Sequence, residues 1–79
     1  MRFKQFQQVA LAKDIPESNL RRGDLATIVE IHPANGGEVG YSIEIFNAVG
    51  DTIAVTTVPE SVLDELTANE ILHVRSLAG

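Results

Sequence analysis

The chain has 79 residues, which is room for one domain, and we expect residues 1–79 to form it. With 44% hydrophobic and 22% charged residues, its composition is that of a globular domain rather than a disordered chain. The absence of cysteine excludes disulfides, thiol catalysis and cysteine-ligated metals, and the net charge of −5 argues against nucleic acid as a partner.

The first half of the chain predicts two strands. Residues 8–12 form a short apolar run, and residues 13–17 end it because Pro16 cannot donate to a ladder. Residues 20–24 have the composition of a tight turn. They lead into residues 25–32, which are rich in β-branched side chains and form the clearest strand of the sequence.

The second half predicts a hairpin. Residues 33–38 carry Pro, Asn and two Gly, and therefore predict a loop. Residues 41–47 alternate, with Tyr, Ile and Ile on one face. A short turn with Gly50 in the left-handed conformation then leads to a strand over residues 52–58, which Pro59 stops.

The end of the chain predicts a helical turn and a last strand. Residues 61–66 suit one or two helical turns, with Ser61 as N-cap and Asp64 at the capping-box position. Residues 71–77 form a fifth short strand. Five short strands with one short helical turn before the last predict an all-β fold, a small five-stranded SH3-like barrel, because closure removes exposed sheet edges.

The charges are divided unevenly along the chain. Residues 1–22 hold five of the six Lys and Arg residues, whereas residues 23–79 hold nine of the eleven acids. One interpretation is that the two parts compensate each other in the fold. The other is an acidic surface that attracts a basic protein partner.

Two carboxylates, Glu30 and Glu44, lie in the middle of predicted strands. Directly opposite each other they would repel, and such a pair serves acid–base chemistry or holds a cation. The favoured interpretation is that the register offsets them, or that both lie on a solvated outer face. The side chains then expected to face inward are Val29, Ile31, Ile43 and Ile45.

The sequence favours neither a metal site nor a catalytic one. His32 and His73 lack metal-ligand spacing, and they would form a site only if their strands met, with Glu30 or Glu70 as a third ligand. No serine lies in a nucleophile elbow, and the glycines form no phosphate-binding loop. We therefore predict no catalytic, cofactor-binding or metal-binding residues.

The basic residues of the N-terminal part offer a nucleic-acid alternative. Arg2, Lys4, Arg21 and Arg22 are the candidate phosphate contacts, with Phe3 and Phe6 as aromatic neighbours. The favoured interpretation is a solvated N-terminus whose two phenylalanines cap the open end of the core. The acidic remainder of the surface would repel phosphate.

Several runs of the sequence resemble one family. Three runs are similar to the opening of a family of small bacterial domains of unknown function: Asp-Ile-Pro-Glu at residues 14–17, Leu-Arg-Arg-Gly-Asp at residues 20–24 and Thr-Ile-Val-Glu at residues 27–30. Later runs at residues 41–46, 52–55 and 70–75 also match. The family has glycine where this chain has Ala26. The resemblance implies an SH3-like barrel and supplies no biochemical role.

The leading hypothesis is a non-catalytic interaction module that binds a protein partner, as the inhibitory or regulatory member of a bacterial pair. The exposed acids expected to contact it are Glu38, Asp51, Asp64 and Glu65. A homodimer through an unpaired strand edge is an alternative. No run approaches the roughly 18 apolar residues of a membrane span, and the N-terminus lacks a signal-peptide core, so we expect a cytoplasmic protein.

Overall fold

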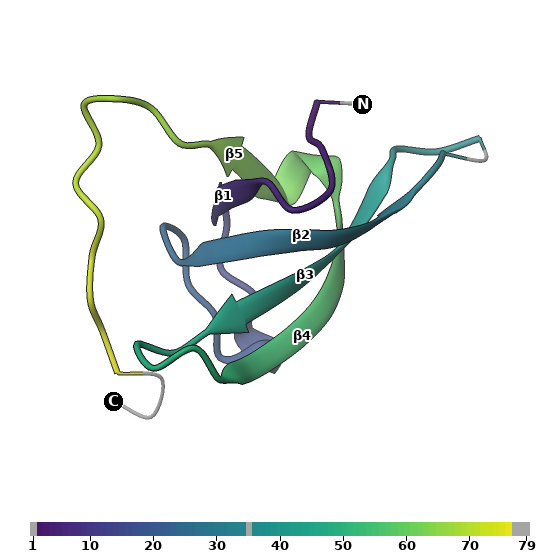
Figure 1. Cartoon of the computed structure of the whole chain (residues 1–79). Coiled ribbons are helices and arrows are strands. Elements are labelled where there is room, and N and C mark those ends of the chain that lie inside the picture. Colours follow the sequence, from purple (N-terminus) through teal and green to yellow (C-terminus); the bar gives the residue numbers. More distant parts are fainter. Residues whose placement is uncertain (1, 35, 77–79) are drawn as a thin grey trace.

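The computed structural model describes residues 2–34 and 36–76, and in this part the fold is all-β. Its strands are β1 (Gln8–Leu11), β2 (Leu25–His32), β3 (Gly40–Phe46), β4 (Thr52–Pro59) and β5 (Leu63–Glu65). Two single 3-10 turns, η1 (Pro16–Ser18) and η2 (Glu60–Val62), interrupt them (Figure 1). In the described residues, no helix is long and apolar enough to cross a membrane.

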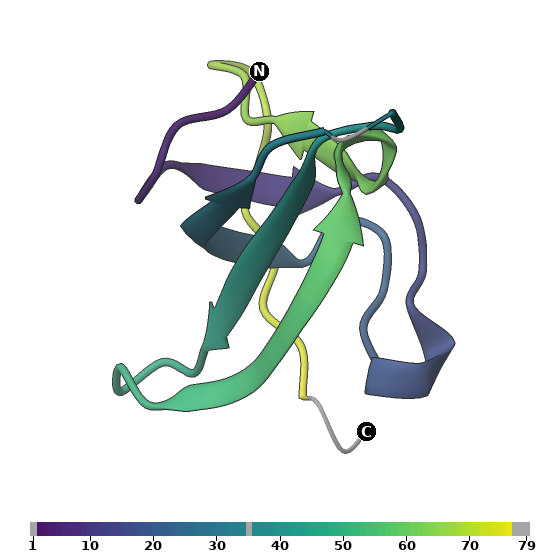
Figure 2. The ribbon, with the colours of Figure 1, turned by 90° about the vertical axis from the view of Figure 1, so that its right-hand side faces the viewer.

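The five strands form one antiparallel sheet in the order β4-β3-β2-β1-β5. The chain meanders from β1 to β4, and η2 then carries it over to β5, which pairs with β1. The sheet curls on itself, so that β1 and β5 lie across from β3 and β4, and β2 joins the two parts (Figures 1 and 2). This order, with a 3-10 turn before the last strand, is that of an SH3-like barrel, and the predicted fold class is confirmed.

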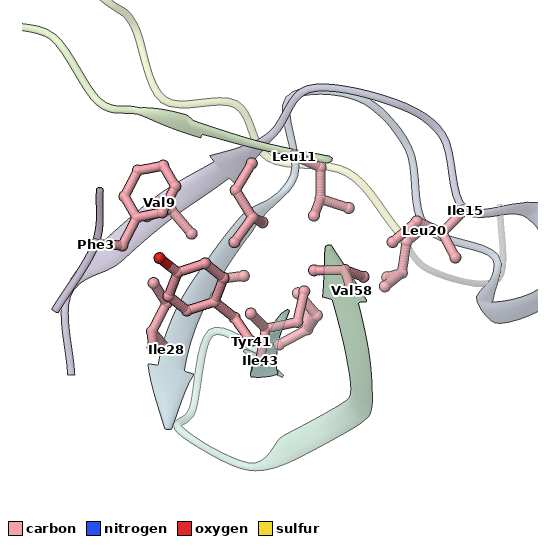
Figure 3. Close-up of a cluster of buried hydrophobic side chains, with 12 residues drawn as sticks. Phe3, Val9, Leu11, Ile15, Leu20, Ile28, Tyr41, Ile43 and Val58 are labelled. Atoms are coloured by element: carbon pink, nitrogen blue, oxygen red, sulfur yellow. The ribbon is translucent and has the colours of Figure 1, made fainter. Parts of the chain in front are cut away.

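The core lies between the two parts of the curled sheet. Phe3 lies at one end of it, with its ring 5.5 Å from that of Tyr41 in an edge-to-face contact, and Ile15 and Leu20 lie at the other end (Figure 3). The buried hydrophobic side chains are Phe3, Val9, Ala10, Leu11, Ile15, Leu20, Ala26, Ile28, Tyr41, Ile43, Ile45, Val58 and Leu63. All strands contribute, so burial of this cluster holds the sheet curled.

The alternation of β3 is confirmed, whereas that of β2 is interrupted. The prediction that Val29 faces inward is wrong, because Ile28 is fully buried and Val29 only half-buried. Ile28 pairs with Ile43 and Glu30 with Ser42, so Val29 is an extra residue, a β-bulge. The bulge shifts the alternation of inward and outward side chains by one residue. Ile31 therefore packs against the core, as predicted.

The last strand was predicted in the wrong place. Residues 71–76 form no strand, and Leu77 lies outside the described residues. The fifth strand is β5, because Leu63 is fully buried opposite Leu11. The chain then turns at Thr67–Glu70, where the Glu70 N–H donates to the Thr67 carbonyl. Beyond this turn the chain runs along the surface, as Figure 1 shows.

The predicted capping box at Ser61 is also absent. The 3-10 turn η2 begins one residue earlier, at Glu60, and spans three residues. The backbone N–H and hydroxyl of Ser61 both donate to the carboxylate of Glu38, so Ser61 caps nothing. The predicted loop over residues 33–38 connects β2 to β3, with Asn35 outside the described residues.

Only one of the two N-terminal phenylalanines caps the core. Phe3 is buried, but Phe6 is 70% exposed. Phe6 has φ of +69° in a turn, and its N–H donates to the Ile28 carbonyl beside the bulge. This turn directs the Phe6 ring into solvent, so the prediction that it covers the open end of the core is wrong.

Candidate functional site

Four acids lie along η2 and β5, and we name them the acidic rim: Glu38, Glu60, Asp64 and Glu65. Glu38 belongs to the loop between β2 and β3, and its two carboxylate oxygens accept the N–H (3.1 Å) and the hydroxyl (3.0 Å) of Ser61 in η2. Asp64 and Glu65 follow η2 in β5 and are exposed. Two of the four predicted contact residues thus lie on β5, and a third, Glu38, contacts η2 directly before that strand.

The fourth member of the rim, Glu60, was not predicted. Its Oε2 accepts the hydroxyl of the buried Tyr41 at 2.5 Å and the backbone N–H of Arg2 at 3.1 Å. The Tyr41 hydrogen bond and then the Arg2 N–H lower the pKa of Glu60 from its usual 4.5. Glu60 therefore remains ionised, and its negative charge is fixed in place at the rim.

One cation lies beside the rim. The guanidinium of Arg2 stacks 4.7 Å from the centre of the Phe3 ring, and its Nη1 lies 3.5 Å from the Leu63 carbonyl oxygen. Its side chain thus rests on an aromatic face and a carbonyl. Its positive charge offsets part of the rim's negative charge without forming an ion pair with a carboxylate.

Asp51 lies away from the rim. It belongs to the β3–β4 hairpin, where its N–H and that of Val49 donate to the side-chain oxygen of Asn47. The two strands pair from Gly40–Pro59 near the rim to Phe46–Thr52 at the hairpin. At about 3.3 Å per residue this separation is about 20 Å, so Asp51 does not share a surface patch with the other predicted contacts.

The acids of this chain are mostly not neutralised by its own cations. In residues 2–34 and 36–76, Asp24 is the one carboxylate within ion-pair distance of a Lys or Arg side chain. It binds Arg75 through both oxygens, with 2.7 Å between Nε and Oδ1. This pair lowers the pKa of Asp24 and raises that of Arg75. The acidic charge therefore remains largely at the surface.

The register offsets the two mid-strand carboxylates, as the favoured interpretation had it. Glu30 lies opposite Ser42, whereas Glu44 lies opposite Thr27. The partner of Glu30 on β3, Ser42, is two residues from Glu44, and the bulge at Val29 lies between the two pairs. The two carboxylates are therefore not opposite each other. They form no acid–base pair.

A histidine and a serine meet on the outer face of the sheet, which the sequence did not predict. Nε2 of His32 lies 2.7 Å from Oγ of Ser42 and 3.5 Å from Oε1 of Glu30. Ser42 in turn lies 3.1 Å from the hydroxyl of Thr57. Serine and glutamate approach the same ring nitrogen, whereas a catalytic triad uses both nitrogens. This is a hydrogen-bonded, partly exposed surface cluster.

The two histidines do not meet. His32 pairs with Gly40 at one end of the hairpin, whereas His73 lies on the surface segment after β5. Within the described residues, no three His, Asp or Glu side chains are placed to hold a metal ion.

The basic residues also fall into two groups. Arg2 and Lys4 flank Phe3, at one end of the core in Figure 3. Arg21 and Arg22 follow Leu20, at the other end, and their backbone N–H groups donate to Asp24 and Asp14. The fold forms no continuous basic stripe from these four residues.

A groove of about 560 Å³ lies where the C-terminal segment passes the β3–β4 hairpin. Its lining includes Phe46 and Ile53 from the hairpin and His73 and Val74 from the segment. The Asp24–Arg75 ion pair also lines it. The groove is apolar at the hairpin and charged at the ion pair.

The chain was compared with protein families, curated proteins and solved structures. Neither the curated proteins nor the solved structures gave a match. A family model matches residues 5–65, which run from the N-terminal turn to the end of β5. The chain therefore belongs to DUF4926, a family described as a domain of unknown function.

Proposed function

We propose that this protein is a non-catalytic interaction module whose acidic rim binds a basic protein partner. In this proposal it is the inhibitory or regulatory member of a bacterial pair and acts in the cytoplasm. The observation that carries the proposal is the rim itself, where Glu38, Glu60, Asp64 and Glu65 gather without a Lys or Arg side chain in ion-pair contact.

The rim suits electrostatic recognition for two reasons. Glu60 has a lowered pKa and keeps its charge in mildly acidic solution. Glu38 is held by two hydrogen bonds from Ser61, so its position is fixed before any partner arrives. Prearranged like charges at one surface raise the association rate of an oppositely charged partner and make it sensitive to salt.

Nucleic acid is the alternative partner, and the split of the basic residues counts against it. Phosphate binding draws on a contiguous basic surface. Arg2 and Lys4 instead flank Phe3, whereas Arg21 and Arg22 follow Leu20, and Phe3 and Leu20 lie at opposite ends of the core (Figure 3). A metal-binding role is also less favoured, because His32 and His73 lie apart.

Affinity capture tests the proposal. The tagged chain is incubated with a lysate of the native host at low and at high salt, with and without nuclease, and bound proteins are identified by mass spectrometry. We expect one basic protein that is retained at low salt, released at high salt and unaffected by nuclease.

Two results would overturn the proposal. Retained material that disappears after nuclease treatment would identify the protein as a nucleic-acid binder. A captured protein that is acidic, or whose retention does not change with salt, would show that the rim does not carry the interaction.

A further inference from the structure

The turn before β2 holds the carboxylate of Asp24 in a fixed orientation. Its Oδ2 accepts the backbone N–H of Arg21 at 2.8 Å, and its own N–H donates to the Arg21 carbonyl at 3.0 Å. The Asp24 side chain is only 15% exposed, so its charge is partly removed from water. A carboxylate in such a place is costly unless a cation and hydrogen-bond donors face it.

The oxygens gathered at this turn match a guanidinium. Arg75 donates from Nε to Oδ1 of Asp24 at 2.7 Å and from Nη2 to Oδ2, and the same Nη2 donates to the Asn19 carbonyl at 3.1 Å. Asn19 ends η1 in the left-handed conformation, with φ of +55°, and this sets the direction of its carbonyl. The planar fork of an arginine fits three such acceptors, whereas the ammonium of a lysine does not. The turn therefore favours arginine over lysine.

The groove beside this ion pair is not filled by the apolar side chains of the C-terminal segment. Its hairpin side is apolar, and Phe46 and Ile53 there remain 44% and 40% exposed. The segment brings His73 and Arg75, two residues apart, to the groove as it passes the hairpin (Figure 1). Its apolar side chains are largely exposed: Ile71 (86%), Leu72 (58%) and Val74 (99%). The groove of about 560 Å³ therefore has room for an apolar side chain of another chain.

From these contacts we propose that Asp24, the Asn19 carbonyl and the apolar groove form a docking site for a peptide segment with an apolar residue two positions before an arginine. Arg75 of the chain's own C-terminal segment occupies the arginine position in the free protein and competes with such a partner. The site lies within the matched family domain, residues 5–65, and the competing arginine lies outside it. The inference is independent of the proposed function, because the site shares no residue with the acidic rim.

NMR titration of the full chain with a synthetic peptide of residues 70–76 tests the proposal. We expect the peptide to bind the Arg75→Gln protein about tenfold more tightly than wild type, as for a site that Arg75 occupies about nine-tenths of the time. The amides of Phe46 and Ile53 should shift as the peptide binds. Lys4→Gln is the matched control, because it removes one positive charge beside Phe3, at the opposite end of the core, and leaves the wild-type affinity unchanged.

Two changes in the peptide test the chemistry of the site against the Arg75→Gln protein. Arg75→Lys in the peptide keeps the charge but loses the planar fork, and it should weaken binding by about tenfold. His73→Leu in the peptide places an apolar side chain against the hairpin, and it should strengthen binding by about tenfold.

Four results would overturn the proposal. The first is no binding of the peptide to the Arg75→Gln protein at millimolar concentration, and the second is equal affinity for this protein and wild type. The third is equal affinity of the arginine and lysine peptides. The fourth is a set of amide shifts confined to η2 and β5, which would place the peptide at the acidic rim. Failure of this proposal leaves the binding of a basic protein at the rim untouched.

Discussion

At the residue scale, the contact between Tyr41 and Glu60 links the core to the acidic rim. The Tyr41 side chain is buried, and burial followed by the hydrogen bond to Glu60 raises the pKa of its hydroxyl above the usual 10.0. The same bond is the main cause of the lowered pKa of Glu60. The contact therefore stabilises the folded state only while Tyr41 is neutral and Glu60 is ionised.

Tyr41→Phe removes this hydrogen bond and keeps the ring. We expect the pKa of Glu60 to rise toward 4.5, measured by NMR titration of its side chain. Wild type is more stable than the variant between about pH 4.5 and pH 10.0, where Glu60 is ionised and Tyr41 is neutral. Because the pKa of Glu60 is lowered, the stability that the hydrogen bond adds is lost as pH falls below 4.5 and Glu60 is protonated. Because the pKa of Tyr41 is raised, the same stability is lost as pH rises above 10.0 and Tyr41 ionises. A stability difference independent of pH would contradict this.

The sequence could indicate some residues of the site but not their neighbours. Asp64 and Glu65 could be predicted as exposed acids, because consecutive carboxylates are rarely buried. The role of Glu60 could not, because it depends on the Tyr41 hydroxyl reaching the end of β4. The contact between His32 and Ser42 depends on the register of β2 and β3 after the bulge at Val29, which local sequence does not specify.

At the element scale, β5 closes the sheet with only three residues, and one of them is buried. Leu63→Ala leaves a cavity in the core at the end of the β1–β5 pairing, where Leu63 lies opposite Leu11, and should lower the free energy of unfolding by about 2–5 kcal/mol. Leu72→Ala removes the same atoms from a side chain that is 58% exposed, and should change it by about 0.5 kcal/mol or less. Chemical denaturation measures both. Equal losses would mean that the segment around Leu72 also forms part of the core.

The C-terminal segment, residues 66–76, is tethered by Arg75. Asp24→Asn and Arg75→Gln each remove the ion pair that holds it to the turn before β2. We expect faster backbone motion at Leu72 and Val74 in both variants, with core amides unchanged, measured by NMR relaxation. The lowered pKa of Asp24 means that wild type loses the tether only as pH falls below 3.8. Motion in the variants equal to that of wild type at neutral pH would contradict this role.

The central strands could be predicted because each has seven or eight residues, enough to show an apolar or β-branched pattern in the sequence. β2 matches its predicted residues, β3 begins and ends one residue earlier than predicted, and β4 ends one residue later. The last strand could not be placed, because residues 71–77 have the apolar alternation of a strand while Leu63–Glu65 are too few to show one. Pairing with β1 decides the matter, since the buried Leu63 meets Leu11.

At the scale of the whole molecule, folding does not pair most of the acidic residues with the basic residues of the N-terminal part. Arg75 alone pairs with a carboxylate among the described Lys and Arg side chains, so local compensation is slight. Binding of a basic partner to the rim consequently weakens as salt rises.

Charge reversal at the rim tests the central claim most directly, with the affinity of the captured partner measured across a range of salt. Glu65→Lys changes the rim, and Glu17→Lys makes the same change of charge in η1, away from it. The account predicts that Glu65→Lys weakens binding by about tenfold at low salt and flattens the salt dependence, while Glu17→Lys changes the affinity by about twofold or less. Equal losses from both variants would show that only the total charge matters, and an unchanged affinity in Glu65→Lys would contradict a binding site at the acidic rim.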